Sequence, residues 1–78
     1  MARLRLFGPA REAAGLACDQ VPGDTTGEVL IAAAARYGSE FAALLPACQV
    51  WVNGEPADRV RSVSDHDEMG VLPPFSGG

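Results

Sequence analysis

The sequence predicts an α+β domain in which one main helix packs across one face of a small sheet. Three observations lead to this expectation. Apolar and polar residues alternate over residues 3–8 and again over 48–55, as they do in half-buried strands. Between these segments, residues 25–38 combine a helix start signal, an alanine-rich run and a glycine stop. The third observation is length, because 78 residues hold one hydrophobic core, which makes 1–78 a single domain.

The first expected strand has the sequence RLRLFG. Its alternation places Leu4 and Leu6 on a buried face and Phe7 on the opposite face, together with two arginines. Gly8-Pro9 ends this strand, because proline fixes its own φ angle and has no amide donor. A short polar loop is expected next, and residues 16–21 (LACDQV) then return as the second strand.

The main helix is expected over TTGEVLIAAAARYG. Thr25 and Glu28 have the spacing of a capping box, in which the two side chains satisfy free backbone donors of the first turn. Alanine has the highest helix propensity, and Gly38 is a natural stop. Residues 39–45 are expected to add a helical turn before Pro46 interrupts.

The second half of the chain predicts the remaining strands. Residues 48–52 alternate, and the Asn53-Gly54 pair that follows tolerates the positive φ angles of a tight hairpin turn. The mixed segment 55–63 is expected to hold one short edge strand, and EMGVL at 68–72 forms the last strand.

The parity of these strands divides their large side chains between two faces. The residues expected to face the helix are Leu4, Leu6, Val50, Val52, Met69 and Val71. Phe7, Trp51 and Leu72 are then left on the open face, where three large apolar groups predict a partner surface. The alternative is that one or more of them packs beneath a loop.

Charge and hydropathy exclude several classes of function. The formal net charge is −4, and all six basic residues are arginines. An acidic chain without a basic run argues against binding nucleic acid or an anionic membrane surface. No apolar run approaches the ~20 residues that span a bilayer, and the start of the chain does not resemble a signal peptide, so we expect a cytoplasmic protein. Without lysine, the chain offers no side-chain amine through which copies could be linked to one another.

Cysteine and histidine give no sign of a metal site. Cys18 and Cys48 are far apart and form no CxxC pair, so we expect both to be reduced and buried. The only histidine, His66, lies between Asp65 and Asp67. Three consecutive side chains do not easily converge on one ion, so a solvated turn is expected there.

The segment 73–78 has the composition of a presented, flexible tail. Pro73 and Pro74 make a stiff stem, and Phe75 can anchor this stem against a partner. Ser76, Gly77 and Gly78 then offer a narrow tip, because glycine has no Cβ to obstruct a channel.

The functional group of such a tip is the α-carboxylate of Gly78. This group is ionised at neutral pH, with a reference pKa of about 3.3–3.7, and is a poor electrophile. It becomes reactive when another protein activates it, for example by adenylation with ATP, and a sulfur nucleophile can then capture the acyl adenylate.

Three stretches carry a family resemblance: RLFGPAREAAG, VWVNGEPA and DHDEMGVLPPFSGG. Together they resemble the MoaD/ThiS family of ubiquitin-like sulfur carriers, most closely its molybdopterin synthase branch. The resemblance covers the whole chain, and PPFSGG is its most specific element. It implies the β-grasp fold, with a mixed sheet, in agreement with the element order expected above.

The resemblance also implies a cycle of sulfur transfer. An E1-like adenylating enzyme would consume ATP at Gly78, and a sulfurtransferase or cysteine desulfurase would supply sulfur for a C-terminal thiocarboxylate. The tail would then enter the large subunit of molybdopterin synthase and pass sulfur to a pyranopterin precursor. The chain itself would bind no cofactor and would not catalyse alone.

Individual residues match the family pattern. Gly77 and Gly78 match the terminal pair, and Pro73, Pro74 and Ser76 match the stem. Phe7 and Leu72 match apolar positions of the partner-facing sheet surface, and Arg11 lies in a matching stretch and is expected to contact a partner. Two departures are His66, where this turn usually has glycine, and Phe75, which is bulkier than the usual small aliphatic residue.

Other readings of the same features stay open at this point. Related carriers serve thiamine thiazole synthesis or cysteine biosynthesis. A ubiquitin-like protein modifier would join Gly78 to lysines of targets, and isopeptide conjugates would reveal it. A plain interaction module would dock its Pro-Pro-Phe segment, and its binding would survive loss of Gly78.

Overall fold

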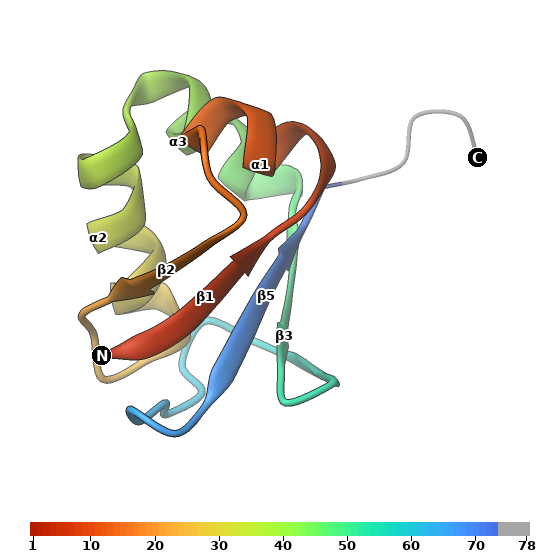
Figure 1. Ribbon diagram of the computed structural model, residues 1–78. Helices are drawn as coiled ribbons and strands as arrows, with labels where there is room; N and C mark the ends of the chain where they lie inside the picture. Colours follow the sequence, from red (N-terminus) through yellow and green to blue (C-terminus); the bar gives the residue numbers. More distant parts are fainter. Residues whose placement is uncertain (74–78) are drawn as a thin grey trace.

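A mixed sheet of five strands forms the centre of the computed structural model, which describes residues 1–73 (Figure 1). The strands are β1 (Ala2–Leu6), β2 (Cys18–Val21), β3 (Gln49–Val52), β4 (Glu55–Ala57) and β5 (Glu68–Leu72). Their order in the sheet is β2-β1-β5-β3-β4. The central pair, β1 and β5, is parallel, and the other neighbours are antiparallel. The predicted α+β class and mixed sheet are confirmed.

The helices cover one face of this sheet (Figure 1). They are α1 (Gly8–Ala14), α2 (Thr26–Tyr37) and α3 (Ser39–Leu44), followed by a short 3₁₀ helix, η1 (Leu45–Ala47). Helix α2 is the predicted main helix. Helix α3 is the predicted additional helical turn, and η1 begins directly before Pro46.

Helix α1 replaces the polar loop that was expected after the first strand, so that expectation was wrong. Pro9 lies in the first turn, where its missing amide hydrogen costs no hydrogen bond, and alanine, arginine and glutamate favour the turns that follow. Gly15 ends the helix in the left-handed conformation with φ 81°, and its N–H donates to the carbonyl of Arg11 at 2.9 Å. A helix of seven residues is too short to show a clear apolar period.

One of the two hydrogen bonds of the predicted capping box is present at the start of α2. The backbone N–H of Glu28 donates to the hydroxyl of Thr25 at 3.2 Å, as predicted. The Glu28 carboxylate instead accepts from the N–H of Asp24 at 3.0 Å, one residue earlier than the capping box requires. Gly38 ends α2 with φ 105°, as expected.

The core lies between the sheet and the helices. All six residues predicted to face inward are buried: Leu4, Leu6, Val50, Val52, Met69 and Val71. Phe41 of α3 is the largest fully buried side chain, and its ring meets that of Tyr37 edge to face with centroids 5.0 Å apart. This edge-to-face geometry is favourable for aromatic rings, so α3 contributes directly to the core.

The hairpin between β3 and β4 is confirmed. Asn53 has φ 51° and Gly54 has φ 84°, so both residues of the tight turn take positive φ angles. Strand β4 then pairs with β3 at the edge of the sheet, within the segment predicted to hold a short edge strand.

Cysteine burial matches the prediction at one position only. Cys48 is buried, its thiol donates to the carbonyl of Leu44 at 3.1 Å, and burial raises its pKa. Cys18 is exposed, which contradicts the prediction. The register aligns Cys18 with Arg5, an outward-facing residue, so the thiol lies on the open face of the sheet.

Each aspartate around His66 has a protein partner. Asp65 forms an ion pair with the amino group of Met1, and Asp67 accepts from Asn53 Nδ2 at 2.9 Å. His66 is exposed, as expected for a solvated turn. Over residues 1–73 there is no group of three or more His, Cys, Asp and Glu side chains arranged to hold a metal ion. Within the same range, no helix has both the length and the apolar character needed to cross a membrane.

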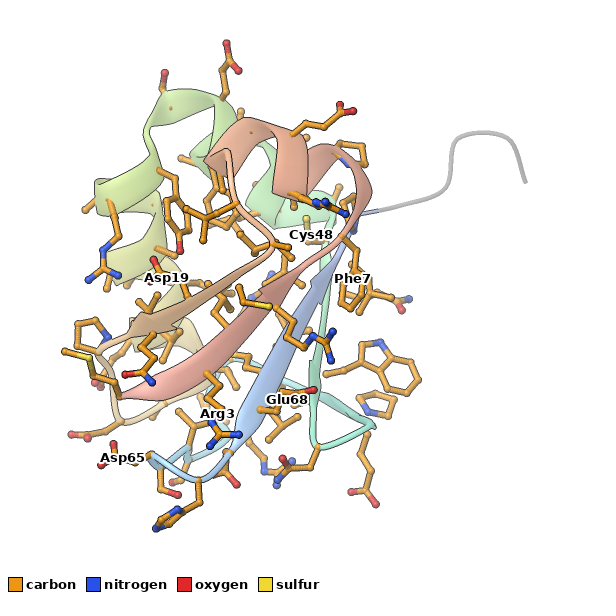
Figure 2. The ribbon with its side chains drawn as sticks, viewed as in Figure 1. Arg3, Phe7, Asp19, Cys48, Asp65 and Glu68 are labelled. Carbon is orange, nitrogen blue, oxygen red and sulfur yellow. The ribbon has the colours of Figure 1, made fainter. Side chains whose placement is uncertain are left out.

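Asp19 links β2 to the end of α2. It faces the helices, accepting from the Tyr37 hydroxyl at 2.6 Å and from Arg36 at 2.9 Å (Figure 2). The hydrogen bond from Tyr37, followed by that from Arg36, lowers the pKa of the Asp19 carboxyl. Burial and the same carboxylate raise the pKa of the Tyr37 hydroxyl.

We expect Asp19→Asn to destabilise the domain by about 1 kcal/mol at pH 7, a typical loss for a partly exposed charged hydrogen bond. Because the native pKa of Asp19 lies below its unfolded value of ~3.9, the carboxylate stabilises the fold above that pH. This stabilisation is lost as the pH falls through the native pKa. Urea unfolding at several pH values should therefore show the two proteins converging in acid. Glu12→Gln, at an exposed carboxylate of α1, is the control and should show no such difference.

Candidate functional site

The open face of the sheet carries a cluster of apolar side chains beside the end of β5. We call this cluster the apolar cluster and define it as Phe7, Trp51 and Leu72. Phe7 is 44% exposed, and the other two are half-buried. All three line one hollow of about 290 Å³. The structure thus brings together three of the residues that the sequence predicted for a partner surface, on the face opposite the core.

Gly70 forms the floor of the hollow. The sheet register aligns it with Trp51 on β3 and with Arg5 on β1. A Cβ atom at this position would lie 3.6 Å from Leu72 Cδ1 and 3.6 Å from Phe7 Cε2, an ordinary contact distance. The missing side chain therefore leaves the space that the apolar cluster surrounds. Sequence reasoning missed Gly70, although a glycine inside a strand is a recognised sign of close approach by another group.

The backbone fixes where Phe7 lies. Phe7 is the residue that caps the start of α1, with extended φ and ψ of −130° and 150°. Its carbonyl accepts from the N–H groups of Ala10 at 3.2 Å and Arg11 at 3.4 Å. Figure 2 shows its ring beside the end of β5. Arg11 is exposed on α1, so the structure leaves it accessible near the same edge of the domain.

The open face is more basic than the protein as a whole. Arg3 and Glu68 point outward from their strands (Figure 2), and the alternation along β1 places Arg5 on the same face. Arg5 approaches Glu68 at 3.5 Å, with about half of each side chain exposed at 52% and 49%. Such an exposed pair contributes little to stability and can be rearranged by a partner. Two guanidinium groups against one carboxylate give this face a positive balance on a protein of net charge −4.

A second, shallow depression adjoins the first. It is lined by Arg3, Arg5, Cys18, Gln20 and Glu68, and it shares Arg5 and Glu68 with the hollow over Gly70. The open face therefore offers one continuous surface that is apolar near the end of β5 and polar toward β2.

Pro73 follows β5 and is buried, so it belongs to the body of the domain rather than to a projecting tail. The other residues predicted for the tail, Pro74, Phe75, Ser76, Gly77 and Gly78, lie outside the described residues. Their insertion into a partner, and the reactivity of the Gly78 carboxylate, stay predictions. The apolar cluster lies beside the end of β5, since Leu72 is both its member and the last residue of that strand.

Comparisons with known proteins agree on the family and the fold. The sequence model of the ThiS family matches residues 4–78. A search of curated proteins found no significant match.

Solved structures resemble the whole chain. Small archaeal modifier protein 1 from Methanosarcina acetivorans has a TM-score of 0.86 at 24% identity, covering 99% of this chain and 95% of that one. In the BexX/CysO complex of Amycolatopsis orientalis, the matching chain has a TM-score of 0.83 at 21% identity, with both chains covered completely. In the complex of subunits 1 and 2 of molybdopterin-converting factor from Helicobacter pylori 26695, the values are 0.68 and 22%, covering 99% and 97%. At these identities the likeness establishes the fold, which is the predicted β-grasp, ubiquitin-like one.

Proposed function

This chain belongs to the ThiS family of ubiquitin-like sulfur carriers and modifiers, and from that premise we propose that it carries sulfur as a thiocarboxylate on Gly78 for the synthesis of molybdopterin. One structural observation supports this function above the others. The apolar cluster lies on the open face of the sheet, beside the end of β5 and therefore beside the start of segment 74–78. A partner that held this cluster would receive the following residues in its own active site.

The proposed chemistry uses the carboxylate of Gly78 and requires other proteins. In an E1-like adenylating enzyme, a carboxylate oxygen attacks the α-phosphorus of ATP and pyrophosphate leaves. The terminal sulfur of a persulfide, carried by a sulfurtransferase or a cysteine desulfurase, then attacks the carbonyl carbon and displaces AMP, which gives an acyl disulfide. A thiol cleaves the S–S bond of this intermediate, so that the thiocarboxylate stays on Gly78 and the donor leaves as a disulfide with that thiol. The activation is necessary because the free carboxylate is ionised and unreactive at neutral pH.

The acceptor step takes place in the large subunit of molybdopterin synthase. Sulfur leaves the carbonyl carbon of Gly78 for the pyranopterin precursor, and water restores the carboxylate. This chain acts as a co-substrate, and binding through the apolar cluster holds the reacting group near the acceptor. Support for this branch comes from the motifs FGPARE and PPFSGG and from the likeness to the Helicobacter pylori complex.

A second candidate is a protein modifier or a carrier of another pathway. This candidate is supported by the structural likeness to small archaeal modifier protein 1 and to the matching chain of the BexX/CysO complex. As a modifier, Gly78 would be joined to lysines of target proteins, and the targets would be other proteins because this chain contains no lysine. Isopeptide-linked peptides recovered from cells would identify this activity.

We expect the thiocarboxylated chain to lose its sulfur when it is mixed with the large subunit and the pyranopterin precursor. Intact mass spectrometry follows the sulfur on Gly78, and product analysis detects the dithiolene. Retention of sulfur, with a large subunit that is active on another carrier, would overturn the molybdopterin assignment. The same chain would then be assayed with the thiazole-forming and cysteine-forming partners.

A further inference from the structure

The hollow over Gly70 has the size of a site for one side chain. Its volume of about 290 Å³ lies just below the roughly 300–1,000 Å³ typical of small-molecule pockets. It is larger than the ~150 Å³ cavity that takes up one benzene molecule. One aromatic or long aliphatic side chain would therefore fit in it between Phe7, Trp51 and Leu72. Buried apolar anchors of this kind commonly dominate the binding energy of an interface.

The rim of this hollow indicates the charge of its occupant. Arg5 and Glu68 both line the hollow, and Arg3 lies across from Glu68 in the register of β1 and β5. Within residues 1–73, Arg3 has no ion pair, and Arg5 is held only by the weak, half-exposed contact with Glu68. Arg5 lines the hollow and Arg3 lines the adjoining depression, so a carboxylate placed where the two meet would lie near both guanidinium groups, whereas an added cation would meet like charge.

The same charges argue against a second copy of this chain as the occupant. Two open faces pressed together would place four guanidinium groups against two carboxylates, counting Arg3, Arg5 and Glu68 from each copy. Like charges brought together at an interface oppose association. The open face is therefore suited to a different, acidic partner.

We propose that the hollow over Gly70 is a socket for one bulky apolar side chain that a partner protein presents beside a carboxylate. This socket rests on the proposed function, since a carrier must dock on its partners. Peptide binding to the hollow can be measured without any partner enzyme. The peptide can therefore fail to bind while sulfur transfer succeeds, and it can bind while sulfur transfer fails.

The test is an NMR titration of the ¹⁵N-labelled protein with two blocked dipeptides, N-acetyl-Phe-Glu-amide and N-acetyl-Phe-Lys-amide. We expect the Glu peptide to shift the Gly70 amide and the Trp51 indole N–H at low salt. The Lys peptide should bind several-fold more weakly, and added salt should reduce this difference because exposed charges are screened. Equal binding of the two peptides at low salt would overturn the charge part of the proposal.

Gly70→Val tests the socket itself. The φ angle of Gly70 lies outside the left-handed region and the space above it is open, so valine is compatible with the strand, and Tm should stay the same or rise. We expect at least a tenfold loss of peptide binding. Gln20→Val, which adds valine to the same face on β2, is the matched control and should bind as the wild type does. Undiminished binding by a folded Gly70→Val protein would show that the socket does not exist.

Arg5→Gln tests the rim. It should remove most of the preference for the Glu peptide, whereas Arg61→Gln, outside the open face, should retain it.

Sedimentation of the wild type adds an independent measurement, with a monomer expected at low salt. A dimer that Gly70→Val dissociates would show that a second copy occupies the hollow, against the proposal.

Discussion

Deletion of Gly78 is expected to abolish sulfur loading completely while leaving the fold intact. The deletion leaves a terminal carboxylate on Gly77, but this group lies one residue, about 3.3–3.6 Å, short of the position that the proposed cycle uses. Within the described residues 1–73 the buried core runs from Ala2 to Val71, so we expect its packing to survive the deletion. Intact mass after incubation with the adenylating enzyme, ATP and a sulfur source measures the loading, and thermal unfolding measures the fold.

Binding should separate from chemistry in this variant. The apolar cluster and the hollow are unchanged, so affinity for the large subunit should stay within a few-fold of the wild type. Gly78→Ala keeps the carboxylate at its original position and adds one methyl group, so partial loading there would show that the loss in the deletion comes from the shortened reach of the carboxylate. If the deletion variant still supported the cellular function, the protein would be an interaction module and the carrier proposal would be wrong.

Phe41→Ala is expected to have the largest effect on stability among truncations of the described core residues to alanine. The ring is fully buried and packs edge to face on Tyr37, and removal of a buried Phe side chain costs about 3–5 kcal/mol. Domains of this size have only ~5–15 kcal/mol of stability, so much of it would be lost. For 60–100 residues this corresponds to a fall in Tm of roughly 12–40 °C. Circular dichroism at 222 nm during heating measures the change.

Ile31→Ala is the matched control for that experiment. Ile31 lies on α2 with 73% of its surface exposed, so it also loses apolar atoms but leaves no internal cavity. Its Tm should change by only a few degrees. Similar losses in the two variants would show that α3 does not form part of the cooperative core.

Most of the sheet could be predicted from the sequence, because the residues that specify each strand and turn are close neighbours in the chain. The alternation of Leu4 and Leu6, and of Val50 and Val52, determines which face of each strand is buried. Asn53-Gly54 likewise specifies its own turn, because few residue pairs adopt two positive φ angles.

The features that sequence reasoning missed depend on pairing between distant residues. Cys18 is exposed because β2 pairs with β1 in a register that local patterns do not reveal. Gly70 matters because Phe7 and Trp51, both distant in sequence, flank it together with Leu72 of its own strand. Helix α1 is the exception, since its proline, its glycine stop and its helix-forming residues are all local. Sequence reasoning missed α1 because seven residues are too few to show a clear apolar period, and not because the helix depends on distant contacts.

The position of β5 has a consequence for how the protein is made. Among the described residues 1–73, β5 is the last strand to be synthesised, yet it lies in the centre of the sheet between β1 and β3. Before β5 leaves the ribosome, β1–β2 and β3–β4 are two separate antiparallel pairs, and an isolated pair of strands is at best marginally stable. Folding of the sheet is therefore delayed until β5 has been translated. A nascent chain cannot display the apolar cluster to a partner before translation has passed Leu72, which belongs to both β5 and the cluster.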